Sequence, residues 1–169
     1  MEKKVLIAYA SKYGSTEQIA ENIGLRLKKA GLKTDVRAAE IVENLSGYVA
    51  VVLGSGVYAG QWLKAGVTFL KTNADALAEM PVWLFSDGPT GEGDPVELMK
   101  GWKFLGALQS TANEIKPRDT AFFHGVLDMD KLKFAEKLII RALKAPTGDF
   151  RDWEAIHEWA DGIAKALKK

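Results

Sequence analysis

The chain of 169 residues contains no cysteine and only two histidines. The lack of cysteine excludes disulfides, thiolate catalysis, iron–sulfur clusters and most zinc sites. His124 and His157 are too few to build a histidine-based metal centre. The side chains therefore offer little catalytic chemistry of their own.

Net charge and long apolar runs are also scarce. The chain has 23 basic and 22 acidic residues and a formal net charge of +1, so it lacks the overall positive potential that attracts nucleic acid or anionic lipid. No stretch approaches the roughly 20 apolar residues that span a bilayer, and the apolar run at residues 5–10 is too short for a signal peptide. We expect a cytoplasmic protein with no nucleic-acid partner.

Short, continuous apolar runs alternate with segments of helical period, which is typical of strands covered on both faces by helices. The predicted strands are residues 5–10, 34–38, 48–53, 82–85 and 121–123. The predicted helices are one that contains Ile19, Ile23 and Leu27 and ends near Gly31, followed by residues 62–79, 96–113, 130–144 and 152–168. The pattern predicts an α/β fold, a doubly wound five-stranded parallel sheet with helices on both faces, in a single domain over residues 1–169.

Two features of the last third of the chain have a structural and a functional interpretation. The basic amphipathic helix at residues 130–144 favours ordinary packing on the sheet, and contact with a membrane surface is the alternative. His124 is interpreted as a surface residue at the end of the fifth strand, with an approach to substrate as the alternative. His157 lies on the apolar stripe of the last helix and is expected to be structural.

In a doubly wound sheet, ligands bind beyond the carboxyl ends of the strands, so the loops there are the candidate site. Amides at a helix N-terminus and hydroxyl groups bind anions, and glycine lets the backbone close around them. The loop after the first strand has this composition and is therefore a candidate phosphate site, with an ordinary N-capped helix as the alternative. It consists of Ser11, Lys12, Tyr13, Gly14, Ser15 and Thr16.

The loops after the third and fourth strands are candidates for holding a planar ring. The first combines three glycines with two aromatic residues, and the second is polar and offers hydrogen bonds to the edge of a heterocycle. The residues are Gly54, Ser55, Gly56, Val57, Tyr58, Ala59, Gly60, Gln61 and Trp62 in the first, and Ser86, Asp87, Gly88, Pro89, Thr90 and Gly91 in the second. A weak match to the dinucleotide fingerprint at Gly54, Gly56 and Ala59 leaves a nicotinamide-binding Rossmann-type domain as an alternative.

Together these loops resemble the flavodoxin family. Ser11 to Thr16 is similar to its phosphate loop of form T-x-T-G-x-T, and the likeness covers nearly the whole chain. It is closest to the branch that includes the menaquinone-dependent protoporphyrinogen dehydrogenases, which has counterparts of the stretch 52–62 and of the Asp152-Trp153-Glu154 helix start. The resemblance implies a strand order 2-1-3-4-5 and FMN as the cofactor, with the phosphate on the first loop and the ring between the other two.

The function implied by this resemblance is that of an FMN-binding oxidoreductase or electron-transfer flavoprotein, which would act with a redox partner protein or with a small-molecule or quinone substrate. Since the third loop has no aromatic residue, Tyr58 and Trp62 are expected to stack on the ring. A net charge of +1 is unlike that of the strongly acidic electron-carrier flavodoxins. We also expect a backbone group near Gly56–Gly60 to face flavin N5, and Asp87 to lie near the pyrimidine end of the ring. The segment at 123–130 is short, whereas the dehydrogenase branch has a long basic insertion near its fifth strand. A flavin-free binding module is the remaining alternative.

Overall fold

The computed structural model describes residues 4–98 and 108–169, and its centre is one sheet of five parallel strands. The strand order is β2-β1-β3-β5-β6, which confirms the predicted order 2-1-3-4-5. These strands are β1 (Lys4–Ala10), β2 (Lys33–Ala38), β3 (Tyr48–Tyr58), β5 (Val82–Asp87) and β6 (Asp119–Phe123). The short strand β4 (Gln61–Trp62) pairs antiparallel with the end of β3.

The apolar runs are continuous because both faces of the sheet are buried. Along β1, Val5 and Ile7 pack into one core, whereas Leu6 and Ala8 pack into the other. Side chains alternate between the faces of a strand, so a strand covered on both sides needs apolar residues at every position.

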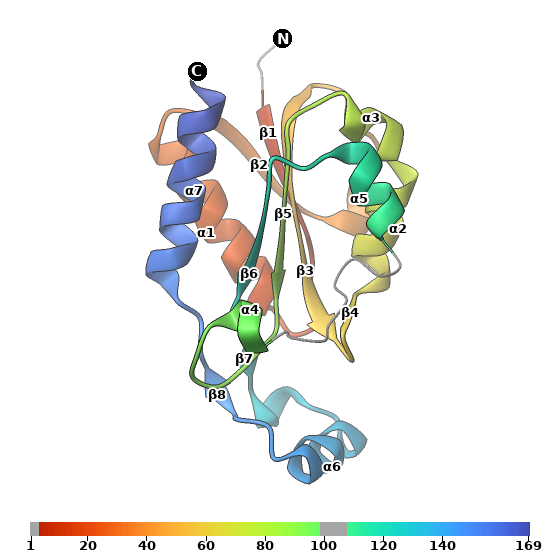
Figure 1. Cartoon of the computed structure of the whole chain (residues 1–169), viewed down its shortest axis with the longest axis vertical. Coiled ribbons are helices and arrows are strands. Elements are labelled where there is room, and N and C mark those ends of the chain that lie inside the picture. Colours follow the sequence, from red (N-terminus) through yellow and green to blue (C-terminus); the bar gives the residue numbers. More distant parts are fainter. Residues whose placement is uncertain (1–3, 99–107) are drawn as a thin grey trace.

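Helices cover both faces of the sheet, as Figure 1 shows. One face carries α1 (Ser15–Lys29) and α7 (Trp153–Leu167), which are joined by an ion pair between Arg26 and Asp161. The other face carries α2 (Lys64–Thr72), α3 (Ala74–Ala78) and α5 (Gln109–Ile115), and the short 3₁₀ helix η1 (Ala39–Ile41) follows β2. This arrangement confirms the predicted doubly wound α/β fold.

The helix predicted at residues 62–79 differs from the observed structure at both its start and its middle. Trp62 belongs to β4, and α2 begins only at Lys64. Asn73 separates α2 from α3, and its side-chain and backbone amides both donate to the carbonyl of Phe69, at 2.9 Å and 3.1 Å. Of the helix predicted at residues 96–113, α4 (Pro95–Leu98) and α5 are helical, and residues 99–107 lie outside the described part.

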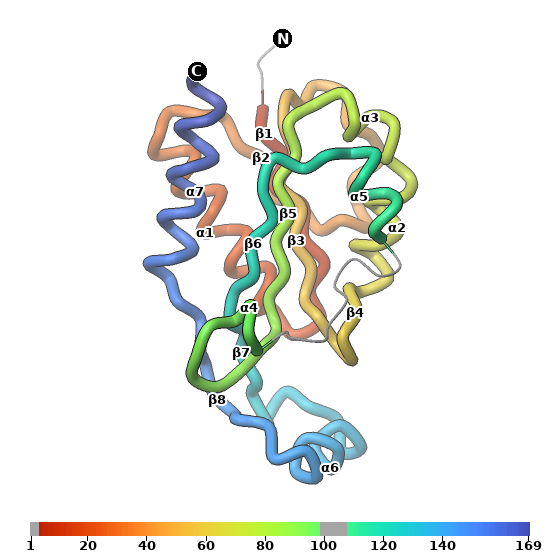
Figure 2. Tube along the Cα trace, viewed as in Figure 1, coloured from red at the N-terminus to blue at the C-terminus, as the bar shows by residue number. Residues whose placement is uncertain are grey.

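The segment between β6 and α7 departs most from the prediction. We call residues 126–151 the cap segment: β7 (Val126–Leu127) pairs with β8 (Gly148–Asp149), and the 3₁₀ helix η2 (Met129–Lys131) and α6 (Phe134–Leu143) lie between them. Figures 1 and 2 show this segment extending beyond the end of the sheet, at the opposite end from the two termini. The stretch at 123–130 is short, as expected, but the course of the chain after it was not predicted.

Helix α6 does not pack on the sheet, so the expected sheet-packing helix was wrong. None of its residues is buried, and Phe134 and Leu143 are 76% and 70% exposed. The β7–β8 pair leads the chain past the end of the sheet, and α7, which follows the cap segment, takes the place beside α1 on the sheet face. Among the described residues, no helix has the length and apolarity that a bilayer crossing requires.

Candidate functional site

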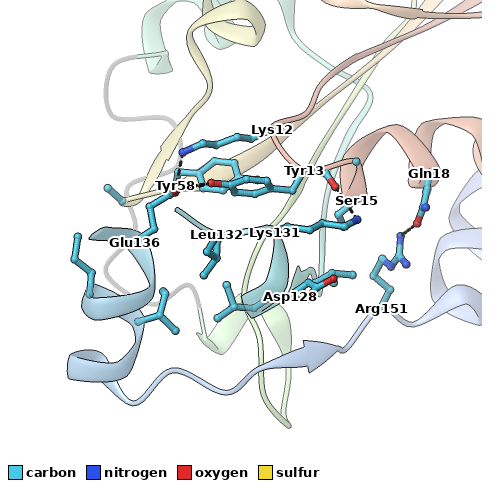
Figure 3. Close-up of a pocket in the computed structure, with 16 residues that line it drawn as sticks. Lys12, Tyr13, Ser15, Gln18, Tyr58, Asp128, Lys131, Leu132, Glu136 and Arg151 are labelled. Atoms are coloured by element: carbon cyan, nitrogen blue, oxygen red, sulfur yellow. Dashed lines mark hydrogen bonds and ion pairs between the residues drawn. The ribbon is translucent and has the colours of Figure 1, made fainter. Parts of the chain in front are cut away.

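A pocket of about 430 Å³ lies at the carboxyl end of the sheet, within the roughly 300–1,000 Å³ typical of ligand sites. It is enclosed by the loop before α1, the turn between β3 and β4, and the cap segment (Figure 3). The lining residues are Lys12, Tyr13, Gly14, Ser15, Gln18, Tyr58, Ala59, Val126, Leu127, Asp128, Lys131, Leu132, Glu136, Ile139, Ile140 and Arg151.

The start of α1 supplies anion-binding groups to one end of this pocket. Gly14 has φ 93°, a left-handed conformation that glycine adopts without strain, and its amide donates to Ser11 Oγ at 3.0 Å. The first amides of α1 follow this turn and have no partner within the helix, and Gly14 and Ser15 line the pocket. The binding of a phosphate by this loop stays a prediction.

Arg151 adds a fixed positive charge on the same side. Its guanidinium donates to Gln18 Oε1 at 2.6 Å and to Asp149 Oδ2 at 2.7 Å, and it lies 4.7 Å from the ring centroid of Trp153. A guanidinium held on three sides loses little further freedom when it binds an anion.

Asp87 lies beneath the loop and not in the pocket wall. It is only 3% exposed, and its two carboxylate oxygens accept hydrogen bonds from Thr16 Oγ1 at 2.5 Å and Ser15 Oγ at 2.9 Å. Burial raises the pKa of Asp87 to about 6, although the two hydroxyl groups oppose that shift. Its charge therefore acts first on the hydroxyls of the predicted phosphate loop, a placement that differs from the expected one near a pyrimidine ring.

Aromatic rings stand at the other end of the pocket. The rings of Tyr13 and Tyr58 meet edge to face with centroids 6.2 Å apart, and Lys12 Nζ lies 5.2 Å and 5.6 Å from them. Below them, Leu132 and Ile140 contribute an apolar wall from the cap segment. This end can hold a flat, partly apolar ring system with its faces against aromatic and aliphatic groups.

The turn after Tyr58 is a two-residue hairpin connection. Ala59 and Gly60 both have positive φ, 50° and 74°, and join Tyr58 to Gln61 across the β3–β4 pair. Two residues with positive φ are the hallmark of a type I′ turn. Ala59, which lines the pocket, adopts this conformation at a steric cost that glycine would not have.

The remaining residues of the second predicted loop belong mostly to β3, which runs on to Tyr58. A Cβ on Gly54 would lie 2.0 Å from the Phe85 ring, so Gly54 is there for packing. Ser55 Oγ accepts from the amide of Leu63 at 3.0 Å, a contact that fixes the start of α2. Gly56 and Val57 are buried within the strand, and Gly60 and Gln61 complete the hairpin; none of the four lines the pocket.

Trp62 and the third predicted loop also lie outside the pocket lining. The Trp62 indole is 6% exposed and donates to Ser86 Oγ at 2.7 Å, so of the two rings expected to stack only Tyr58 is at the pocket. Gly88 donates to the carbonyl of Phe123 at 3.4 Å and thereby joins this loop to β6. Pro89 accepts from the amide of Gly125 at 3.0 Å, Gly91 lies against Pro146, and neither they nor Thr90 line the pocket.

His124 was expected at the surface but is buried, with 9% of its area exposed. Its two ring nitrogens lie 3.2 Å from the carbonyl oxygen of Pro89 and 2.7 Å from that of Gly93. The histidine therefore fastens the loop after β5 to the end of β6, a structural task.

Glu136 of α6 connects the cap segment to the loop before α1. Its carboxylate accepts from Tyr13 Oη at 2.6 Å and from Lys12 Nζ at 2.9 Å. These contacts and the amide of Lys133 lower the pKa of Glu136 to about 2. A carboxylate that stays ionised at neutral pH thus holds the cap segment against the first loop, together with the hydrogen bonds from Lys131 Nζ to the Tyr13 carbonyl and from Arg151 to Gln18.

Sequence reasoning missed the part of the pocket that comes from the cap segment and from the first helix. The only available signal was the wide apolar arc of the helix at 130–144 together with the absence of a strand after it. The missed lining residues are Gln18, Val126, Leu127, Asp128, Lys131, Leu132, Glu136, Ile139, Ile140 and Arg151.

The parallel sheet with a glycine- and hydroxyl-rich loop at its first strand defines a flavodoxin-like protein. Residues 6–154 match the family model described as a flavodoxin domain, and the chain belongs to this family. Family membership implies FMN as its cofactor.

Among curated proteins, the chain is 24% identical to the protoporphyrinogen IX dehydrogenase [quinone] of Escherichia coli K12, over 98% of this chain and 97% of that protein. Among solved structures, it resembles a flavodoxin from the domain Archaea, with a TM-score of 0.60, 15% identity, and coverage of 98% and 99% of the two chains. It also resembles a flavodiiron core from Synechocystis sp. PCC6803, with a TM-score of 0.64 and 16% identity, over 98% of this chain and 36% of that one. These structures share the fold.

The residues around the pocket fit FMN. The phosphate suits the α1 amides beside Ser15, where Gly14 leaves open space and Arg151 supplies positive charge. The isoalloxazine ring suits the space between Tyr58 and the apolar wall of the cap segment. The donor set is complementary to FMN at both ends.

Proposed function

We propose that this protein is an FMN-dependent dehydrogenase that transfers electrons between a small lipophilic substrate and a quinone. The flavodoxin family membership supports flavin redox chemistry, and the name of the relative from Escherichia coli suggests the substrate class. The observation that carries the proposal is the cap segment, which gives the pocket an apolar wall of Leu132, Ile139 and Ile140. An electron carrier needs only an exposed ring edge, whereas a substrate needs such a wall.

In this mechanism the protein binds and orients the flavin and the substrate. FMN, when bound, supplies the redox chemistry. The α1 amides and Arg151 would bind the phosphate, and the Tyr58 side chain would pack against one side of the isoalloxazine ring. Ala59 of the hairpin turn would border the ring, and the apolar residues of the cap segment would exclude water from the substrate.

The alternative function is electron transfer to a protein partner, and the net charge of the chain argues against it. Acidic carriers use a negative surface to find basic partners, and this chain has a formal net charge of +1. The nicotinamide-binding alternative is not supported either, because the glycines of the candidate fingerprint lie within β3 and Gly54 is occupied in packing against Phe85.

Turnover with defined redox compounds tests the proposal. The FMN-loaded protein is expected to oxidise protoporphyrinogen IX with menadione as acceptor, which is followed by the rise of porphyrin fluorescence. The variant Ile140→Glu places a carboxylate in the apolar wall and should raise the KM by about tenfold or more. The matched variant Ile41→Glu, at an exposed position outside the pocket lining, should leave the KM unchanged.

The result that would contradict the proposal is also specific. If the loaded protein exchanges electrons rapidly with a ferredoxin-type protein but oxidises neither the porphyrinogen nor a reduced quinone, it is an electron carrier.

A further inference from the structure

Helix α6 has an exposed apolar face with no partner in the described part of the chain. Phe134 is 76% exposed, Leu138 49%, Ile139 57% and Leu143 70%. They form two pairs four residues apart, Phe134 with Leu138 and Ile139 with Leu143. With the exposed Ala135 and Ala142 between the pairs, they form an apolar arc that covers about half of the helix circumference. Large apolar groups grouped in this way on a monomer mark a surface that meets another apolar phase.

A row of positive charges runs beside this face. Lys133, Lys137 and Arg141 are spaced four residues apart, and each directly precedes a residue of the apolar face, Phe134, Leu138 or Ala142. Lys144 extends the row by one turn. Because adjacent residues lie 100° apart around a helix, the cationic row borders the apolar face along its length.

Negative charge near this row is limited. Glu136 is the one acidic residue between Lys133 and Lys144, and Lys12 and Tyr13 already engage its carboxylate on the pocket side of the helix. Asp128 and Asp130 lie on the preceding turn, where Asp128 caps the amide of Asp130. Helix α6 is therefore locally cationic, although the net charge of the whole chain is only +1.

The position of α6 leaves this face accessible. Figure 1 places the helix at the end of the molecule opposite both termini and beyond the sheet, so a flat surface can meet it without obstruction by the main body. Basic side chains flanking exposed Phe, Leu and Ile residues are typical of helices that lie in the headgroup region of anionic membranes.

The geometry points to α6 as a docking surface for an anionic lipid bilayer, with the apolar face inserted among the acyl chains and the cationic row against the headgroups. Since Glu136, Ile139 and Ile140 of the same helix border the pocket, docking would bring the pocket mouth to the bilayer surface. This inference does not depend on the proposed function, because lipid binding involves no redox step.

The test is co-sedimentation of the full chain with vesicles of phosphatidylcholine containing phosphatidylglycerol, compared with vesicles of phosphatidylcholine alone. Preferential binding to the anionic vesicles that weakens in high salt is expected. Lys137→Gln with Arg141→Gln should lower the affinity by about fivefold per charge removed. Phe134→Ser with Leu138→Ser should lower it by at least about tenfold.

Two comparisons keep the test decisive. The double variant Leu25→Ser with Ile41→Ser removes exposed apolar side chains from α1 and η1, remote from α6, and should bind vesicles like the wild type. Far-UV circular dichroism and thermal unfolding verify that each variant is folded, independently of FMN binding.

Several outcomes would overturn the inference. One is a protein that stays in the supernatant with anionic vesicles, and another is equal binding to neutral ones. A loss of binding in the Leu25 and Ile41 variant equal to that in the α6 variants would also do so. So would a concentration-dependent dimer that only the Phe134 and Leu138 variant abolishes, because α6 would then serve as an interface between two copies of the chain.

Discussion

At the scale of single residues, Asp87 shows how the candidate site links stability to pH. Its folded pKa of about 6 lies above the ordinary value of 3.8 because the carboxylate is buried. Below about pH 4 the group is protonated in both the folded and the unfolded protein. As the pH rises through about 6, the folded protein must ionise a buried carboxylate, so its free energy of unfolding falls.

The variant Asp87→Asn is therefore expected to flatten this part of the stability curve. The amide loses one of the two hydrogen bonds at every pH, which is a constant cost, but it has no charge to bury. Relative to wild type, the free energy of unfolding of the variant should rise by up to about 3 kcal/mol between about pH 4 and pH 7. Urea unfolding at several pH values measures this difference.

The matched control for that experiment is Asp75→Asn, at an exposed position on α3. Its stability curve should run parallel to that of the wild type over the same pH range. A parallel curve for Asp87→Asn as well would show that this carboxylate does not titrate in the folded protein as described.

The sequence indicated the composition of the phosphate loop but not the partners of its hydroxyls. Gly14 and Ser15 could be recognised because a glycine and hydroxyls before an amphipathic helix have a general anion-binding role. That Asp87 lies under Thr16 could not be predicted, since the strand order alone does not determine which side chains meet across the end of β3.

At the scale of elements, the hairpin turn between β3 and β4 contains a residue, Ala59, that both lines the pocket and has a strained backbone conformation. Ala59 has φ 50°, where a Cβ costs about 1–2 kcal/mol. Glycine would remove that cost but increase the freedom of the unfolded chain. Ala59→Gly is therefore expected to raise the free energy of unfolding by about 0.5–1 kcal/mol in urea unfolding.

The neighbouring position supplies the control, with the opposite expected sign. Gly60 has φ 74°, so Gly60→Ala should lower the free energy of unfolding by about 1 kcal/mol. If Ala59→Gly were destabilising, the turn would not carry the strain that its backbone angles indicate.

The elements that sequence reasoning predicted correctly are those whose apolar pattern follows from the sheet. The five strands and helices α1 and α7 have buried faces that their residue periods encode. The cap segment was misjudged because α6 has the same amphipathic pattern as a sheet-packing helix, although its apolar face is in solvent. Periodicity identifies a helix face but not what the face contacts.

At the scale of the whole molecule, the pocket is assembled from segments that are far apart in sequence. Lys12 and Glu136, separated by 124 residues, form the contact that brings the cap segment against the first loop. The flavodoxin family and the strand order were both predictable from the sequence. The enclosure of the pocket was not, because it arises only when a segment after the last strand folds back toward the first.

The central claim, that this pocket binds FMN through its phosphate, is tested most directly by titrating the flavin-free protein with FMN and with riboflavin, followed by flavin fluorescence. The account predicts saturable FMN binding, with riboflavin weaker by at least about a hundredfold because it lacks the group that the α1 amides and Arg151 would hold. Equal affinity for the two flavins, or no saturable binding of FMN, would contradict it.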